Sequence, residues 1–166
     1  MGIINIAARC YDDLMSKISI SYLTKYGNNK TAMEHLSMLL KAKGHEVLLF
    51  DVSESGAEQV PLSDLYVFSS STHIGGLPGK MNKFMQKFPH KSGRYALSVT
   101  HMVEKSGPEK NSGKVLKIMA EDLREVGLTN SVDPLSLAVT GMKGPFEDGW
   151  QKKVETFAVA ILKMLG

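Results

Sequence analysis

The residues with the clearest chemical potential form a short loop between an apolar stretch and an amphipathic one. This loop carries a hydroxyl, a glycine and two side-chain amides, in the order Thr24, Lys25, Tyr26, Gly27, Asn28 and Asn29. A loop that opens a helix points several backbone N–H groups at one spot, where the positive end of the helix dipole adds to them. The loop therefore predicts a phosphate site, and an ordinary capped turn is the alternative.

Two further polar stretches follow later apolar runs. Four hydroxyl residues, 69–72, suit neither a core nor a helix, so we expect them to face a polar ligand or solvent. The candidate contacts that start there are Ser71, Thr72, His73, Ile74, Gly75 and Gly76. The two glycines permit positive φ, while His73 and Ile74 are candidates to lie against a planar ring. Thr100, His101, Met102 and Val103 are candidates for its other side.

No residue pattern indicates a catalytic acid, base or nucleophile, or a metal site. The five histidines show no metal-ligand spacing. A Gly-x-Gly-x-x-Gly turn, a P-loop and a Gly-x-Ser-x-Gly elbow are all absent from the sequence. A phospho-receiver domain is disfavoured as well, because hydroxyls stand where its aspartate would end the third strand. We therefore nominate no catalytic residue and no metal.

An α/β scaffold must position these three stretches. Strands are expected near 17–23, 47–50, 65–68, 95–100 and 132–140, and helices near 30–43, 78–88, 115–126 and 150–165. The continuous apolar run at 47–50 is typical of a strand covered on both faces. Alternating elements predict a three-layer α/β/α domain with a five-stranded parallel sheet. Ligands of such sheets bind beyond the carboxyl ends of the strands.

From residue 17 to residue 166 the chain resembles the flavodoxin-like family, in a short form without a long insertion in the fifth strand. Residues 24–29 look like a variant of its phosphate loop, and residues 71–81 resemble the segment after its third strand. The resemblance implies strand order 2-1-3-4-5 and non-covalent flavin mononucleotide (FMN). Residues 24–29 would hold its phosphate, and 71–76 with 100–103 would flank its isoalloxazine ring.

The same resemblance implies a part in electron transfer. A carrier and a flavin-dependent reductase, for example of quinones, are both compatible with it. Carriers of this family are usually strongly acidic, whereas this chain has a net charge of +3 and a pI near 8.9, which favours a reductase or an unusual partner. The alternative is a domain that has lost flavin and acts as a binding or assembly module. Tyr26, Asn29 and His73, which replace family residues of the flavin site, favour that alternative.

The remaining expectations concern the partners, the location and the N-terminal residues of the chain. Residues 76–117 carry nine basic side chains against Glu104 and Glu109, which predicts either a solvated lysine face or a surface for an anionic substrate or acidic partner. Nucleic-acid binding and a membrane span are not expected. Cys10 is the single cysteine, which fits a cytoplasmic protein. Residues 1–16 are expected to be an N-terminal extension of uncertain status, outside one domain at 17–166.

Overall fold

The structure is a computed structural model that describes residues 15–103 and 110–166. Its strands are β1 (Lys17–Leu23), β2 (Glu46–Asp51), β3 (Leu65–Ser71), β4 (Arg94–Met102), β5 (Thr129–Asn130) and β6 (Leu135–Val139). Its helices are α2 (Asn28–Lys41), the short 3-10 helix η1 (Ala57–Gln59), α3 (Gly79–Gln86), α4 (Lys110–Val126) and α5 (Trp150–Leu165). Every predicted strand and helix is present.

The strands form one parallel sheet in the order β2-β1-β3-β4-β5, with β6 also paired to β4. The predicted order 2-1-3-4-5 is therefore confirmed, but the fifth strand is in two pieces rather than continuous over 132–140. Pro134, which has no N–H for a ladder hydrogen bond, stands in the gap between the pieces. Ser131 bonds to the Tyr95 carbonyl from both its backbone N–H and its hydroxyl, at 3.0 and 2.7 Å, where the first piece ends.

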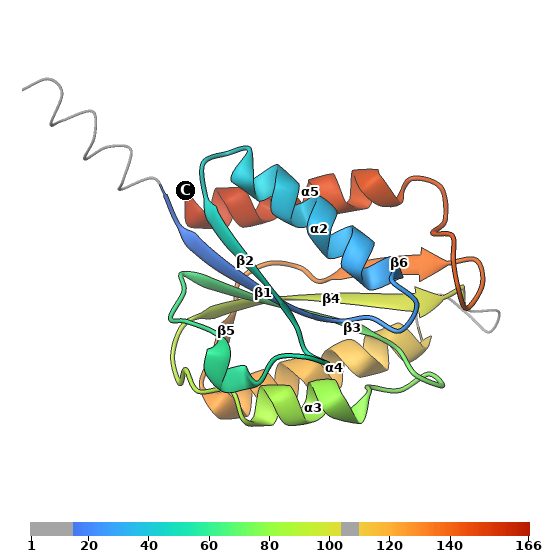
Figure 1. Cartoon of the computed structure of the whole chain (residues 1–166), viewed down its shortest axis with the longest axis horizontal. Coiled ribbons are helices and arrows are strands. Elements are labelled where there is room, and N and C mark those ends of the chain that lie inside the picture. The colour runs from blue at the N-terminus through green and yellow to red at the C-terminus, as the bar shows by residue number, and fades with distance from the viewer. Residues whose placement is uncertain (1–14, 104–109) are drawn as a thin grey trace, which may run out of the picture.

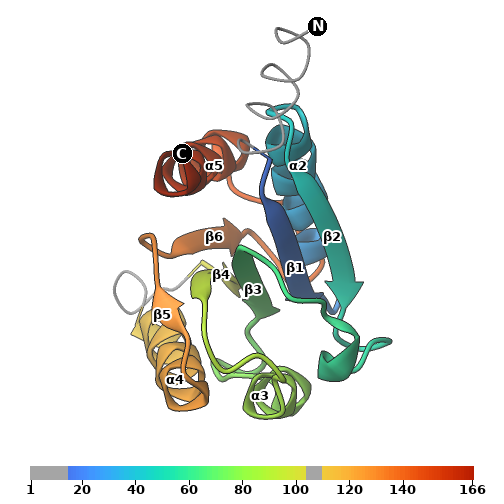
Figure 2. The same ribbon diagram turned by 90° about the vertical axis from the view of Figure 1, so that its left-hand side faces the viewer.

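Two helices cover each face of the sheet, as Figures 1 and 2 show. Helices α2 and α5 pack on one face over Ile18, Ile20 and Val67, and α3 and α4 pack on the other over Phe68 and Val99. Successive residues of a central strand point to opposite faces of the sheet, so each central strand contributes side chains to the hydrophobic core on either face. The three-layer arrangement is confirmed, and it places every strand-to-helix loop at one edge.

Several predicted boundaries are wrong by a few residues, and the differences fall at the site. Helix α2 begins at Asn28 rather than near residue 30, so part of the predicted loop is the first turn of the helix. Strand β3 continues to Ser71, and Ser69 and Ser70 are fully buried rather than facing ligand or solvent. Strand β4 continues to Met102, so Thr100 and His101 lie on a strand. The apolar runs end before the strands do, because polar residues at the strand ends are buried and continue the hydrogen-bond ladder.

The predicted N-terminal extension, residues 1–16, falls almost wholly outside the described residues, as does Cys10. Met15 and Ser16 precede β1, and the Ser16 N–H donates to Nδ1 of His45 at 3.0 Å. None of the helices in the described ranges is both long and apolar enough to cross a membrane.

Candidate functional site

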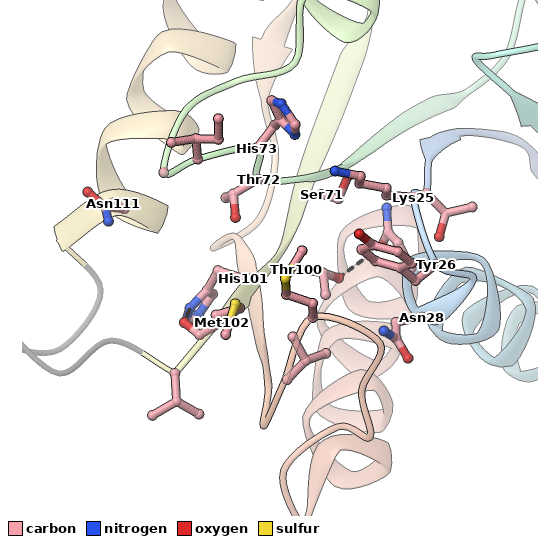
Figure 3. A pocket seen from close by; sticks show the side chains of 17 residues that line it. Lys25, Tyr26, Asn28, Ser71, Thr72, His73, Thr100, His101, Met102 and Asn111 are labelled. Atoms are coloured by element: carbon pink, nitrogen blue, oxygen red, sulfur yellow. Dashed lines mark hydrogen bonds between the residues drawn. The ribbon is translucent and has the colours of Figure 1, made fainter.

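A cavity of about 460 Å³ opens at the carboxyl edge of the sheet, where loops from four strands meet. Fourteen of the sixteen residues predicted to bind a cofactor line this cavity, and the other two, Gly27 and Gly76, belong to the same loops. Three lining residues were missed by sequence reasoning: Asn111, Val139 and Met142. Figure 3 shows Tyr26 and Asn28 entering from the α2 side and His73 and Asn111 from the opposite side.

The loop before α2 presents unpaired backbone donors to this cavity. The Thr24 hydroxyl accepts from the Gly27 N–H at 3.0 Å, and the Gly27 carbonyl accepts from Thr31. Gly27 has φ of +90°, a conformation that other residues adopt only with strain. Among the residues that the structure describes, Thr31 is the first of α2 whose N–H has a protein acceptor, so the N–H groups of Asn28, Asn29 and Lys30 are left unpaired. The first turn of α2 can therefore receive an anion.

The side chain of Asn29 points into the protein rather than toward a ligand. Its amide NH₂ donates to the Leu23 carbonyl at 2.9 Å. Its oxygen accepts from the Ser69 hydroxyl at 2.8 Å and the Thr100 hydroxyl at 3.1 Å, in a position that is 1% exposed. Asn29 thus joins the ends of β1, β3 and β4 directly beneath the cavity. Its backbone N–H is the group left for a phosphate, whereas sequence reasoning had its side-chain amide donating to that group.

The turn after β3 is a tight hairpin at the cavity rim. His73 and Gly76 exchange two backbone hydrogen bonds of 2.8 and 2.9 Å, with Ile74 at φ +50° and Gly75 at φ +74° between them. Two successive positive φ values define a turn that Asn-Gly or Gly-Gly pairs prefer. Ile74 is a β-branched residue in that conformation, which is costly, and its side chain is 95% exposed. A Cβ on Gly75 would come within 3.1 Å of the Asn111 side chain, so the turn lies close against α4.

The end of β4 supplies the other wall of the cavity. The imidazole of His101 is bonded on both sides: Nδ1 lies 2.8 Å from the Met102 carbonyl, and Nε2 lies 3.0 Å from the Ser136 hydroxyl. A carbonyl only accepts, so Nδ1 carries a proton and donates to the Met102 carbonyl. His101 therefore links β4 to β6 through Ser136. Met102 and Val103, each about half exposed, present apolar surface beside it.

The cavity combines a neutral-to-positive electrostatic character with an apolar rim. No Asp or Glu is among its lining residues, and Lys25 brings a cation, with Nζ 5.4 Å from the ring centroid of Tyr26. Of the ten large hydrophobic side chains that are exposed in the described part of the chain, five line the cavity: Tyr26, Ile74, Met102, Val103 and Met142. Such clustering marks a surface that a partner or ligand covers.

Within residues 15–103 and 110–166, no group of three or more His, Cys, Asp or Glu side chains lies close enough to hold a metal ion. The polar groups that converge on the cavity are backbone N–H groups, hydroxyls and amides, which bind anions and hydrogen-bonding ring edges.

A parallel sheet in the order 2-1-3-4-5 with paired helices on both faces, and a cavity beyond the strand ends, is the flavodoxin fold. Flavodoxin 2 of Bacillus cereus matches it with a TM-score of 0.73 at 23% sequence identity, over 89% of this chain and 98% of that one. Flavodoxin 1 of the same organism gives 0.71 at 20% identity over the same shares of the two chains.

A short-chain flavodoxin associated with a non-canonical PDU bacterial microcompartment gives a TM-score of 0.70 at 13% identity, over 90% of this chain and 99% of that one. At these identities the likeness establishes the fold. No family model and no curated protein matches the sequence.

Proposed function

We propose that this chain binds FMN without a covalent bond and takes part in electron transfer. The observation that carries the proposal is the convergence of an anion site and an apolar-rimmed slot in one cavity of about 460 Å³. Two of the solved structures that share the fold, both from Bacillus cereus, are flavodoxins by name. FMN has one anionic end and one planar, largely apolar end, so its two halves match the two halves of this cavity.

The residues present fit the phosphate end of FMN. Three unpaired N–H groups, those of Asn28, Asn29 and Lys30, start a helix of 14 residues, and the dipole of that helix favours a bound anion. Lys25 adds positive charge at the same loop. Tyr26, which replaces a hydroxyl residue of the family motif, is 41% exposed and leaves the backbone donors open.

The residues around the other half of the cavity fit a planar ring. The turn 73–76 and the end of β4 face the cavity from different loops, and Thr72 joins them through its N–H, which donates to the Thr100 carbonyl at 3.0 Å. Apolar contact comes from Ile74, Met102 and Val103, while backbone groups of the turn are available to the polar edge of the ring. Bound FMN supplies the electron-transfer chemistry, and the protein holds, orients and shields it.

The test is reconstitution of the purified chain with flavins. Each N–H to phosphate bond is a charge-assisted hydrogen bond, worth about 1.5–3 kcal/mol. Losing even two of them predicts that riboflavin, which lacks the phosphate, binds at least about 100-fold more weakly than FMN. A yellow protein with that preference supports the proposal. A colourless protein that binds neither flavin would favour the binding or assembly module instead.

The role in electron transfer divides into a carrier and a reductase, for example of quinones. Both ring nitrogens of His101 are engaged in hydrogen bonds within the protein, which supports a carrier. An FMN-loaded chain that oxidises a nicotinamide in the presence of a quinone would instead identify a reductase. We further propose that residues 17–166 form one domain and that the single cysteine reflects a cytoplasmic location.

A further inference from the structure

The layer formed by α3 and α4 carries a cluster of exposed lysines beside the cavity. Lys80, Lys83 and Lys87 follow one another at spacings of three and four, so they share one face of α3 and the residue after it. Lys114 and Lys117 lie on α4, at a spacing of three. All five side chains are exposed. The two helices lie side by side (Figures 1 and 2), so we name these five residues the lysine face.

The lysine face has no neutralising partner in the described part of the chain. Residues 72–103 and 111–120 contain no Asp or Glu, and Glu104 and Glu109 fall outside the described residues. The ion pairs that the structure describes, Lys30–Glu34 and Lys152–Glu155, lie on the opposite helical layer. On α4, Glu121 and Glu125 occupy the half that is remote from the cavity. Lys80, Lys114 and Lys117 therefore place positive charge beside the cavity, and Lys83 and Lys87 extend it along α3.

Helix stability explains only part of this pattern. Lys83 lies in the last turn of α3 and Lys87 follows the helix, so both charges meet the negative end of the helix dipole. Lys80 lies in the first turn, which has no acidic residue, and there its charge meets the positive end of the dipole. Lys80, Lys83 and Lys87 also repel one another along one face. The position of Lys80 and this repulsion are therefore not explained by the stability of the helix.

The lysine face borders the apolar rim of the cavity. The turn that exposes Ile74 ends at Gly76, four residues before Lys80, and lies against Asn111 at the start of α4. Met102 and Val103 add apolar surface at the end of β4. An apolar centre with a charged border is the usual composition of a protein interface. A nucleic acid fits less well, since no aromatic side chain on α3 or α4 is exposed to stack on bases.

We propose that this surface docks an acidic redox protein, with the lysine face steering the encounter and Ile74, Met102 and Val103 forming the contact. The proposal rests on the proposed flavin function, because the apolar contact surrounds the part of the cavity assigned to the ring. Charge on one face raises association rates with an oppositely charged partner, and salt removes the effect.

The experiment uses cytochrome c in two forms as the probe. The native protein is strongly basic, and succinylation of its lysines makes it acidic while it keeps its haem. The FMN-loaded chain is reduced with dithionite, excess reductant is removed, and haem reduction is followed in a stopped-flow instrument. Each ferric haem takes one electron, so one fully reduced FMN reduces two cytochromes and releases its protons to solvent.

We expect the succinylated form to react about tenfold faster than the native form at low ionic strength, with the difference disappearing at high salt. The triple variant Lys80→Gln, Lys83→Gln, Lys87→Gln should lose most of that advantage. A control with the same charge change on the opposite layer, at Lys41, Lys153 and Lys163, should keep it. A faster reaction of the native form, or equal losses in both variants, would overturn the proposal.

A second measurement separates this proposal from the flavin function. The chain without FMN should bind succinylated cytochrome c in a salt-sensitive titration and lose that binding in the Lys80, Lys83 and Lys87 variant. Binding of this kind in a chain that takes up no flavin would refute the flavin function and leave the docking surface standing. Failure to bind, or tighter binding of a DNA duplex through the same lysines, would refute the docking surface.

Discussion

Replacement of Asn29 by alanine tests how the strand ends are held together beneath the cavity. The Asn29 amide makes one hydrogen bond to the Leu23 carbonyl and accepts one each from Ser69 and Thr100. These partners belong to the ends of three adjacent strands, and Asn29 itself is 1% exposed. Alanine would leave the two hydroxyls and the carbonyl to find other partners in a dry environment.

The magnitude follows from that list of bonds. A typical buried hydrogen bond contributes about 1 kcal/mol, and a buried group left unsatisfied costs about 1–3 kcal/mol. Three lost bonds, offset in part by rotation of the two hydroxyls, predict a loss of about 3–4 kcal/mol in the free energy of unfolding of Asn29→Ala. This is a large share of the roughly 5–15 kcal/mol of a typical domain.

The assay is urea unfolding followed through the single tryptophan, Trp150, which is half-buried against His35 and Phe146. Asn82→Ala serves as the matched control, because the Asn82 amide makes only an exposed 3.4 Å bond within α3. We expect that control to change stability by less than about 0.5 kcal/mol. A loss below about 1 kcal/mol in Asn29→Ala would refute the role of Asn29 as the link between the strands.

Three further substitutions test separate features. Gly27→Ala should lower the free energy of unfolding in urea by about 1–2 kcal/mol, because φ at this position is +90° although a Cβ would meet nothing within 4 Å. Gly79 is equally open but has no positive φ, so Gly79→Ala should not lower the free energy of unfolding. Equal effects of the two substitutions would contradict the strain argument. Ile74→Asn should raise the free energy of unfolding by about 1 kcal/mol, because asparagine adopts the left-handed conformation of this exposed turn position more readily than a β-branched residue does. A lower melting temperature of the variant would contradict this. Burial, together with the negative charges of Glu125 and Glu121, raises the pKa of Asp122 above its ordinary value of 3.8. The Asp122 Oδ2 atom has no hydrogen-bond partner in the described part of the chain. The ionised carboxylate therefore destabilises the fold above the raised pKa, and this effect is absent below 3.8, where Asp122 is protonated in both the folded and the unfolded chain. Asp122→Asn should therefore raise the melting temperature at pH 7, and this gain should shrink as the pH falls toward 4; a gain that does not change with pH would contradict it.

The fold was predictable from the sequence because its signals are local. Alternating strands and helices, and apolar stripes such as Met33, Leu36 and Leu40, specify elements without knowledge of their neighbours. Strand order came from the motif resemblance, since no pattern within one strand states which strand lies beside it. The break in the fifth strand was not predicted, although Pro134, which has no N–H for a ladder hydrogen bond, stands in the gap.

The sequence predicted the loops that form the cavity, and the errors about its lining residues come from tertiary contacts. Asn29 was expected to donate from its side chain to a phosphate, because nothing local shows that Ser69 and Thr100 meet above its oxygen. Asn111 was missed because the helix that carries it was expected to start at residue 115. Met142 lies in a loop whose approach to the cavity is set by the sheet, with no local signal of its own.

The central claim is that one cavity holds the two ends of a flavin through separate loops. Amide chemical shifts, followed by NMR while FMN and then riboflavin are added, test it most directly. We predict that FMN shifts the amides of Asn28, Asn29 and Lys30 together with those of residues 72–76 and 100–103. Riboflavin should shift the second set and leave the first largely unchanged. Shifts confined to other parts of the sheet, or identical shifts at the start of α2 with both flavins, would contradict the account.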